Sequence, residues 1–191
     1  MEHSKAQDSI TAGLITQRTG SERMGAGGVF TVTCVGADGQ EKWSDSFHNL
    51  VVNQGLQDMN SKYFSGSSYT ATWYIGLYGA AASNNPAASD TMASHAGWTE
   101  IVPYSNATRP ACTFGTATTA DPSVITNSAS PAAFTINATA TVGGAFLTSN
   151  NTKSGSTGIL FSASDFAAPG DRVVANGDTL NVTYTFSLDA A

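Results

Sequence analysis

The last part of the chain alternates strictly between apolar and polar residues. After the turn Asn176-Gly177-Asp178, every second residue is apolar, and the residues between them are Thr, Asn and Ser; the apolar set is Leu180, Val182, Tyr184, Phe186 and Leu188. A period of two is typical of a strand with one buried face. The pattern predicts a long strand over 179–188 with this set in the core.

A second alternating run covers residues 134–142 and predicts another half-buried strand. Its apolar residues are Phe134, Ile136, Ala138, Ala140 and Val142, separated by Thr and Asn. Beyond it, the apolar stretches 145–147 and 159–161 flank the polar stretch 148–158. That arrangement predicts a hairpin with an exposed tip.

The first half of the chain predicts a hairpin, an apolar strand and one helix. Residues 29–35 and 42–50 flank the turn cluster Gly36-Ala37-Asp38-Gly39, which favours a hairpin. The run 73–78 is apolar on both sides, so we expect both of its faces to be covered. Shorter strands are expected at 100–104 and 111–114.

The predicted helix follows Val52. Apolar residues recur at spacings of three and four, and Asn53 is a candidate N-cap; the predicted buried face is Val52, Leu56, Met59 and Tyr63. A helix this short depends on packing for its stability.

About eight strands at this spacing predict an all-β fold, an antiparallel two-sheet β-sandwich of jelly-roll or immunoglobulin-like topology with one short helix. Residues 1–27 are polar and end in Gly25-Ala26-Gly27, so they are expected to form a flexible N-terminal arm before a sandwich domain over 28–191. The long connection 79–97 is expected to contact another part of the protein or a partner.

Composition and charge argue against nucleic-acid and membrane partners. Eight basic and 14 acidic residues give a net charge of −6, without a run of Lys or Arg that could follow phosphates, so no nucleic-acid partner is expected. Neither a signal-peptide core nor an apolar run of about 20 residues is present, so no membrane partner is expected. The sequence therefore predicts a soluble protein made in a cytoplasm, with Cys34 and Cys112 as unbridged buried thiols.

Candidate chemistry is sparse. His3 lies in the arm, His48 ends a strand, and His95 with Asp90 could be drawn as part of a triad, but residues this close in sequence rarely have triad geometry. The turn carboxylates Asp165, Asp171 and Asp178 could join a calcium site, yet no Asp-x-Asp-x-Asp-Gly ladder supports one. We therefore assign no catalytic, cofactor-binding or metal-ligating residue, and expect no cofactor and no enzyme.

Several blocks together carry a resemblance to a known group of proteins. In chain order they are Asn49-Leu50-Val51-Val52-Asn53-Gln54-Gly55-Leu56, Trp73-Tyr74-Ile75-Gly76-Leu77, Asp90-Thr91-Met92-Ala93-Ser94-His95-Ala96-Gly97-Trp98-Thr99-Glu100, Thr108-Arg109-Pro110-Ala111, Gly143-Gly144-Ala145-Phe146-Leu147 and Gly177-Asp178-Thr179-Leu180. The set resembles small virion structural proteins of tailed bacteriophages over residues 47–188. The Asp-Thr-Met-Ala-Ser-His block is its most distinctive part.

The resemblance implies a place on the virion, after synthesis in the host cytoplasm, and carries over no catalytic residue. The role that fits best is a head decoration or cement protein that binds the major capsid protein or other virion proteins on the outer surface of the shell. Alternatives are a tail or tail-fibre component that attaches to host glycans through exposed Trp or Tyr, and a virion-associated hydrolase. A homo-oligomer, a trimer or dimer, is expected, with the N-terminal arm ordered against a neighbouring subunit or the shell.

Overall fold

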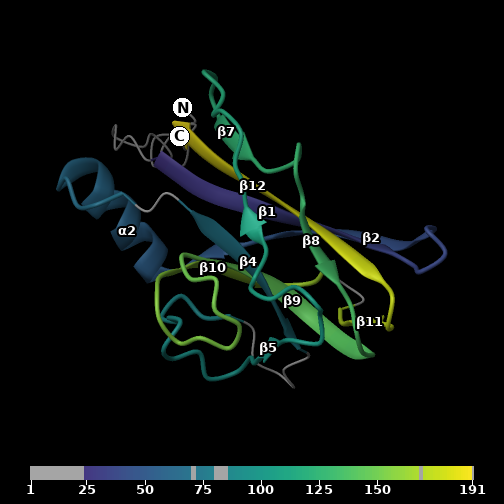
Figure 1. Ribbon diagram of the computed structural model, residues 1–191. Helices are drawn as coiled ribbons and strands as arrows, with labels where there is room; N and C mark the ends of the chain where they lie inside the picture. The colour runs from purple at the N-terminus through teal and green to yellow at the C-terminus, as the bar shows by residue number, and fades with distance from the viewer. Residues whose placement is uncertain (1–23, 70–71, 80–85, 168–169, 191) are drawn as a thin grey trace, which may run out of the picture.

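The computed structural model describes residues 24–69, 72–79, 86–167 and 170–190, which form two antiparallel sheets and one helix (Figure 1). The first sheet has the order β2-β1-β12-β7, and β8 also pairs with β12. Its strands are β1 (Met24–Val35), β2 (Glu41–His48), β7 (Ser123–Thr126), β8 (Ala132–Thr135) and β12 (Thr179–Ala190). The predicted hairpin and the predicted C-terminal strand thus lie side by side.

The second sheet has the order β3-β10-β9-β4-β5, with β11 paired to β9 and β6 paired to β4. Its strands are β3 (Leu50–Val51), β4 (Trp73–Gly79), β5 (Glu100–Ile101), β6 (Ala111–Cys112), β9 (Ala140–Thr148), β10 (Leu160–Asp165) and β11 (Arg172–Val174). The two sheets confirm the predicted all-β sandwich. Because β1 and β12 pair within one sheet, the order differs from immunoglobulin constant-type domains, whose first and last strands lie in opposite sheets.

The main core lies between the inner faces of the two sheets. Leu180, Val182 and Tyr184 of β12 are fully buried there, opposite Ile75 and Leu77 of β4. The alternation of β12 therefore places its apolar side in the core as predicted. Phe186 and Leu188, nearer the end of the strand, are only partly buried.

A second, smaller core covers the outer face of the second sheet. Tyr78 and Phe146 point outward from β4 and β9, and Met92 and Trp98 of the connection after residue 85 pack on them. Both faces of β4 are thus covered, as predicted. The connection makes its contact within the molecule, and Trp98 is buried.

The alternating run 134–142 is not one strand. Residues 132–135 form β8 in the first sheet, and residues 140–148 form β9 in the second. Phe134, Ile136 and Val142 all point into the main core, whereas Ala138 is exposed where the chain crosses between sheets. The alternation of apolar and polar residues continues across the change of sheet because β8 and β9 both turn their inner faces to the same core.

The helix α2 (Asn53–Phe64) exists, but it packs differently from the prediction. Val52 occupies the N-cap position without a side-chain hydrogen bond, so Asn53 is not the cap. Of the predicted buried face, Val52 is buried and Met59 packs against the main core, but Leu56 is 42% exposed and Tyr63 is 84% exposed. The buried residue of the helix is Gly55, where a Cβ atom would overlap the Phe161 carbonyl of β10, so close approach of backbones fixes the helix.

The N-terminal boundary also shifts. Strand β1 begins at Met24, where the residue pairs with Ala190, so residues 24–27 of the predicted arm belong to the sheet. The rest of the arm, with His3, lies outside the described residues. Within the described ranges, no helix is long and apolar enough to cross a membrane.

Candidate functional site

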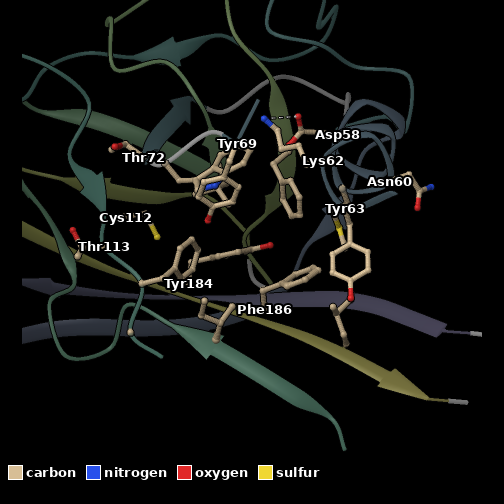
Figure 2. Close-up of a pocket in the computed structure, with 18 of the residues that line it drawn as sticks. Asp58, Asn60, Lys62, Tyr63, Tyr69, Thr72, Cys112, Thr113, Tyr184 and Phe186 are labelled. Carbon is tan, nitrogen blue, oxygen red and sulfur yellow. Dashed lines mark ion pairs between the residues drawn. The ribbon is translucent and has the colours of Figure 1, made fainter. Parts of the chain in front are cut away.

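An apolar cleft opens at one end of the sandwich, between α2 and the first sheet, and has a volume of about 950 Å³ (Figure 2). Its walls come from α2 and the residues after it, from the start of β4, from the segment after β6, and from β7 and β12. Its apolar lining includes Met59, Tyr63, Phe64, Tyr69, Trp73, Phe114, Ile125, Phe186 and Leu188.

The cleft exists because β12 continues past the part of the core that the second sheet covers. Tyr184 is fully buried, whereas Phe186 and Leu188, which point to the same side, are only partly buried, although Phe186 still touches Phe161 of β10. Beside them, Ile125 of β7 pairs across from Phe186 and is also partly buried. The apolar inner face of the first sheet thus forms one wall of the cleft.

The floor of the cleft is part of the main core. Trp73 contacts Phe161 edge to face with ring centroids 5.3 Å apart, and Phe161 contacts Phe186 at 5.4 Å. Below them lie Cys112 and Tyr184, both buried. The cleft therefore reaches the rings that hold the two sheets together.

The rim carries three exposed aromatic side chains. Tyr63 and Phe64 at the end of α2 are 84% and 76% exposed, and Tyr69 after the helix is 79% exposed. Tyr63 and Phe64 contact each other at 4.9 Å between centroids, and Figure 2 shows Tyr63 and Tyr69 on either side of the opening. Neighbouring exposed aromatic residues of this kind mark interaction surfaces.

The charged residues of the cleft neutralise each other. Lys62 and Asp58 are one helical turn apart and form an ion pair of 3.2 Å, and Lys62 also donates a hydrogen bond to the carbonyl of Ser68. The Tyr184 hydroxyl at the floor accepts a hydrogen bond of 2.7 Å from Asn49. Burial raises the pKa of the Cys112 thiol to about 12, which keeps it protonated and unreactive at neutral pH.

The predicted triad candidates lie elsewhere and do not converge. His95 stacks on Trp98 with centroids 3.9 Å apart, and its Nδ1 lies 2.9 Å from the Trp98 carbonyl oxygen. The Asp90 carboxylate accepts hydrogen bonds from the Trp98 indole and from the Ala87 N–H. All three side chains therefore hold the connection onto the second sheet.

The turn carboxylates are likewise engaged separately. Asp165 accepts a hydrogen bond from the Tyr78 hydroxyl, and Asp178 is bound by Lys42 and by the N–H of Ala175. Within the described ranges, no three His, Cys, Asp or Glu side chains are placed to hold a metal ion.

The buried ion pair between Arg109 and Glu100 was not predicted from the sequence, and it holds the loop between β9 and β10. Arg109 is 1% exposed and donates two hydrogen bonds to Glu100, at 2.8 and 2.7 Å, and two more to the carbonyls of Asn150 and Gly155. Every partner is satisfied within the molecule, so the pair holds the 149–158 loop. That loop is the predicted hairpin tip, and Arg109 fixes it in place.

The fold and the cleft together define a β-sandwich protein with an apolar cleft at one end. Comparison of the chain with protein-family models, with curated proteins and with solved structures finds no match. The cleft was missed by the sequence reading because its walls come from segments up to 130 residues apart, from Asp58 to Leu188. The one available signal was the adjacent aromatic pair Tyr63-Phe64, of which Tyr63 was predicted to lie on the buried face of the helix.

Proposed function

We propose that this chain is a non-enzymatic structural protein of a tailed-phage particle, and that within the particle it decorates and stabilises the outer surface of the head. The observation that carries the proposal is the apolar cleft with its exposed aromatic rim. The resemblance to virion structural proteins motivates a place on the phage particle, and the cleft provides a surface that could bind a neighbouring protein.

The chemistry of the cleft favours a stretch of polypeptide as its ligand. An opening of about 950 Å³ lined by aromatic and aliphatic side chains is large enough for several side chains of a partner. Exposed Tyr63, Phe64 and Tyr69 supply the rigid aromatic contacts that contribute most to protein–protein binding. An apolar cleft with an aromatic rim is sufficient for a protein that binds a partner without catalysing a reaction.

Charge also favours an uncharged, apolar partner segment. Because Asp58 and Lys62 pair with each other, the cleft has no free charge among its described residues to select a phosphate or a charged sugar. Burying a charged ligand group there without a partner would be costly.

A second surface suits contact with a shell. On the outer face of the first sheet, hydroxyl side chains of neighbouring strands bond to each other: Thr31 with Ser46 at 2.8 Å, Thr33 with Ser44 at 3.0 Å, and Thr185 with Thr126 at 3.0 Å. A face whose hydroxyl groups pair in this way can pack on another protein without leaving those groups unsatisfied. Two contact surfaces on one small domain would add through effective concentration.

The competing role is a tail or fibre component that attaches to a host glycan. The exposed Tyr63 and Tyr69 favour this alternative specifically, since aromatic rings stack on the apolar faces of sugars. A hydrolase would require a nucleophile, a base and an orienting group that meet, whereas His95 and Asp90 are both engaged by Trp98.

The experiment is an add-back assay on phage particles that lack this chain. Purified protein is mixed with such particles, unbound protein is removed by sedimentation, and occupancy is measured by mass spectrometry and by cryo-electron density on the head. We expect saturable head binding and greater resistance of the head to heat. Density only on the tail, or binding to host polysaccharide without head binding, would contradict the proposal.

The same assay tests the cleft. The double variant Tyr63→Ser with Phe64→Ser should lower head occupancy, because it removes two exposed aromatic contacts. Val173→Ser is the matched control, since Val173 is a 65% exposed apolar residue on β11, away from the cleft. Equal loss in both variants would show that the effect is not specific to the cleft.

A further inference from the structure

The cleft lies where the chain enters the sandwich. In the pairing of β1 with β12, Met24 lies opposite Ala190, Ala26 opposite Leu188 and Gly28 opposite Phe186. Leu188 and Phe186 line the cleft. Strand β1 therefore begins at the open end of the sandwich, beside the cleft.

The residues that precede Met24 contain one apolar stretch. Between Met1 and Arg23, the branched aliphatic residues are Ile10, Leu14 and Ile15, and they lie in the uncharged sequence Ser9-Ile10-Thr11-Ala12-Gly13-Leu14-Ile15-Thr16. A polar linker with Gly20 follows, at residues 16–23. Three aliphatic side chains are too few for a core of their own, but they match a cleft that lacks unpaired charge.

We propose that residues 9–15 of one copy occupy the apolar cleft of a neighbouring copy. This inference rests on the proposed function in one respect, that the cleft binds a polypeptide segment, and it names that segment. Ile10, Leu14 and Ile15 contact Phe186 and Leu188 on one wall and Tyr63 on the other.

Strand direction favours a neighbouring copy over the same copy. Followed backwards, β1 runs from Phe30 through Ala26 to Met24 and so points out of the open end, in the direction in which β12 runs from Phe186 to Ala190. Re-entry into the same cleft would require the chain to turn back on itself beyond Met24. A second copy that presents its open end needs no such reversal.

Reach and symmetry are compatible with this exchange. Eight linker residues span at most about 27 Å when extended, which is enough to cross to an adjoining copy. Two copies that face each other at their open ends can each supply the segment that the other binds, and this reciprocal contact closes with two-fold symmetry. Two joined copies then present two outer sheet faces to the shell, so the exchange strengthens head binding through effective concentration.

The test uses the full chain with Leu14→Ser and Ile15→Ser, which leaves the cleft intact and removes the apolar segment. Light scattering across a range of concentrations should give a dimer for the parent chain and a monomer for this variant. A fluorescent peptide of residues 6–19 should bind the variant saturably. The same peptide with the two Ser substitutions should bind at least about tenfold more weakly, because aliphatic contacts in an interface core are lost.

Substitutions in the cleft provide the matched comparison. Adding Tyr63→Ser and Phe64→Ser to the full-chain variant should weaken peptide binding about tenfold or more. Adding Val173→Ser instead should leave it unchanged, because that exposed side chain lies outside the cleft. These three side chains are exposed, so the variants are expected to fold.

The possible outcomes are separable. A parent chain that stays monomeric while the peptide binds the variant would show that the segment occupies its own cleft, and would overturn the exchange. A peptide that fails to bind would overturn the inference altogether, while head binding in the add-back assay would leave the proposed function standing. A dimer that forms by this exchange but does not bind particles would support the inference and contradict the proposed function.

Discussion

The two ends of β12 show how one strand can be closed at one end and open at the other. At the start of the strand, Asp178 is buried and is bound by Lys42, by the Ala175 N–H and by the Cys34 thiol. At the far end, Phe186 and Leu188 face the cleft. In Figure 1 the β1–β2 turn and β11 lie at the closed end on the right, and α2 lies at the open end on the left.

The two ends differ in whether their side chains are paired and buried or left accessible to solvent. At the closed end, the β1–β2 hairpin and the turn before β12 satisfy both carboxylate oxygens of Asp178. At the open end, Phe186 is only partly buried, and α2 docks through Gly55 and Met59 and leaves Leu56 and Tyr63 exposed. Polar groups are therefore paired at one end, and apolar surface is left accessible at the other.

The largest expected contrast comes from the same substitution at two positions of β12. Val182→Asp should lower the free energy of unfolding by about 4 kcal/mol or more, because it buries an unpaired charge. Leu188→Asp should cost only about 1 kcal/mol, because the cleft gives the carboxylate access to water. Urea unfolding of both variants measures the difference, and equal costs would mean that the cleft is closed to solvent.

The two thiols test how far water enters from each end. Burial, followed by the nearby Asp178 carboxylate, raises the pKa of Cys34 from 9.0 to about 11, and burial raises that of Cys112 from 9.0 to about 12. Alkylation at pH 8 should therefore be about 100-fold or more slower in the native protein than in urea. Cys34→Ala and Cys112→Ala variants isolate the two rates, and a fast Cys112 would mean that the cleft admits reagent to its floor.

The same pKa changes give a dependence of stability on alkaline pH. Because both folded-state values lie above the unfolded value of 9.0, the unfolded chain loses these protons first. The stability that the protonated thiols contribute is complete below about pH 9 and is lost as the pH rises towards 11 and 12. The double Cys→Ala variant should lack this part of the decline.

A smaller effect is expected at the closed end under acid. Burial alone would raise the pKa of Asp178, but hydrogen bonds from Lys42 and from the Ala175 N–H outweigh it and hold the pKa below its usual 3.8. The carboxylate therefore adds stability above about pH 4 that is lost as the pH falls through its folded-state pKa. Asp178→Asn should cost about 1–2 kcal/mol at neutral pH and flatten the acid decline in urea titrations. An unchanged acid decline would contradict the assignment.

The smallest effect on stability is expected at the rim of the cleft. The double variant Tyr63→Ser with Phe64→Ser should change the free energy of unfolding by no more than about 0.5 kcal/mol, since both side chains are exposed. When the same two substitutions are added to the chain that carries Leu14→Ser and Ile15→Ser, its binding of an apolar dye should nevertheless fall. Dye binding that persists would place the apolar surface elsewhere.

The sequence by itself determined which segments form strands and which face of each is apolar. The period of two in 180–188 predicted β12, the turn cluster at 36–39 predicted the β1–β2 hairpin, and the apolar run at 73–78 predicted a strand covered on both faces. These features follow from local geometry, because side chains alternate along any strand and a turn acts on its immediate neighbours. Strands β7 and β11 are too short to show such a pattern and were missed.

Only the tertiary structure decided how these elements are shared between the sheets. The alternation over 134–142 is the same whether its residues belong to one sheet or two, since both inner faces point into one core. For the same reason, nothing local could show that Tyr63 and Leu56 are exposed, or that Gly55 is the residue that docks α2. The cleft depends on where the second sheet ends relative to β12, and that is a relation between segments distant in sequence.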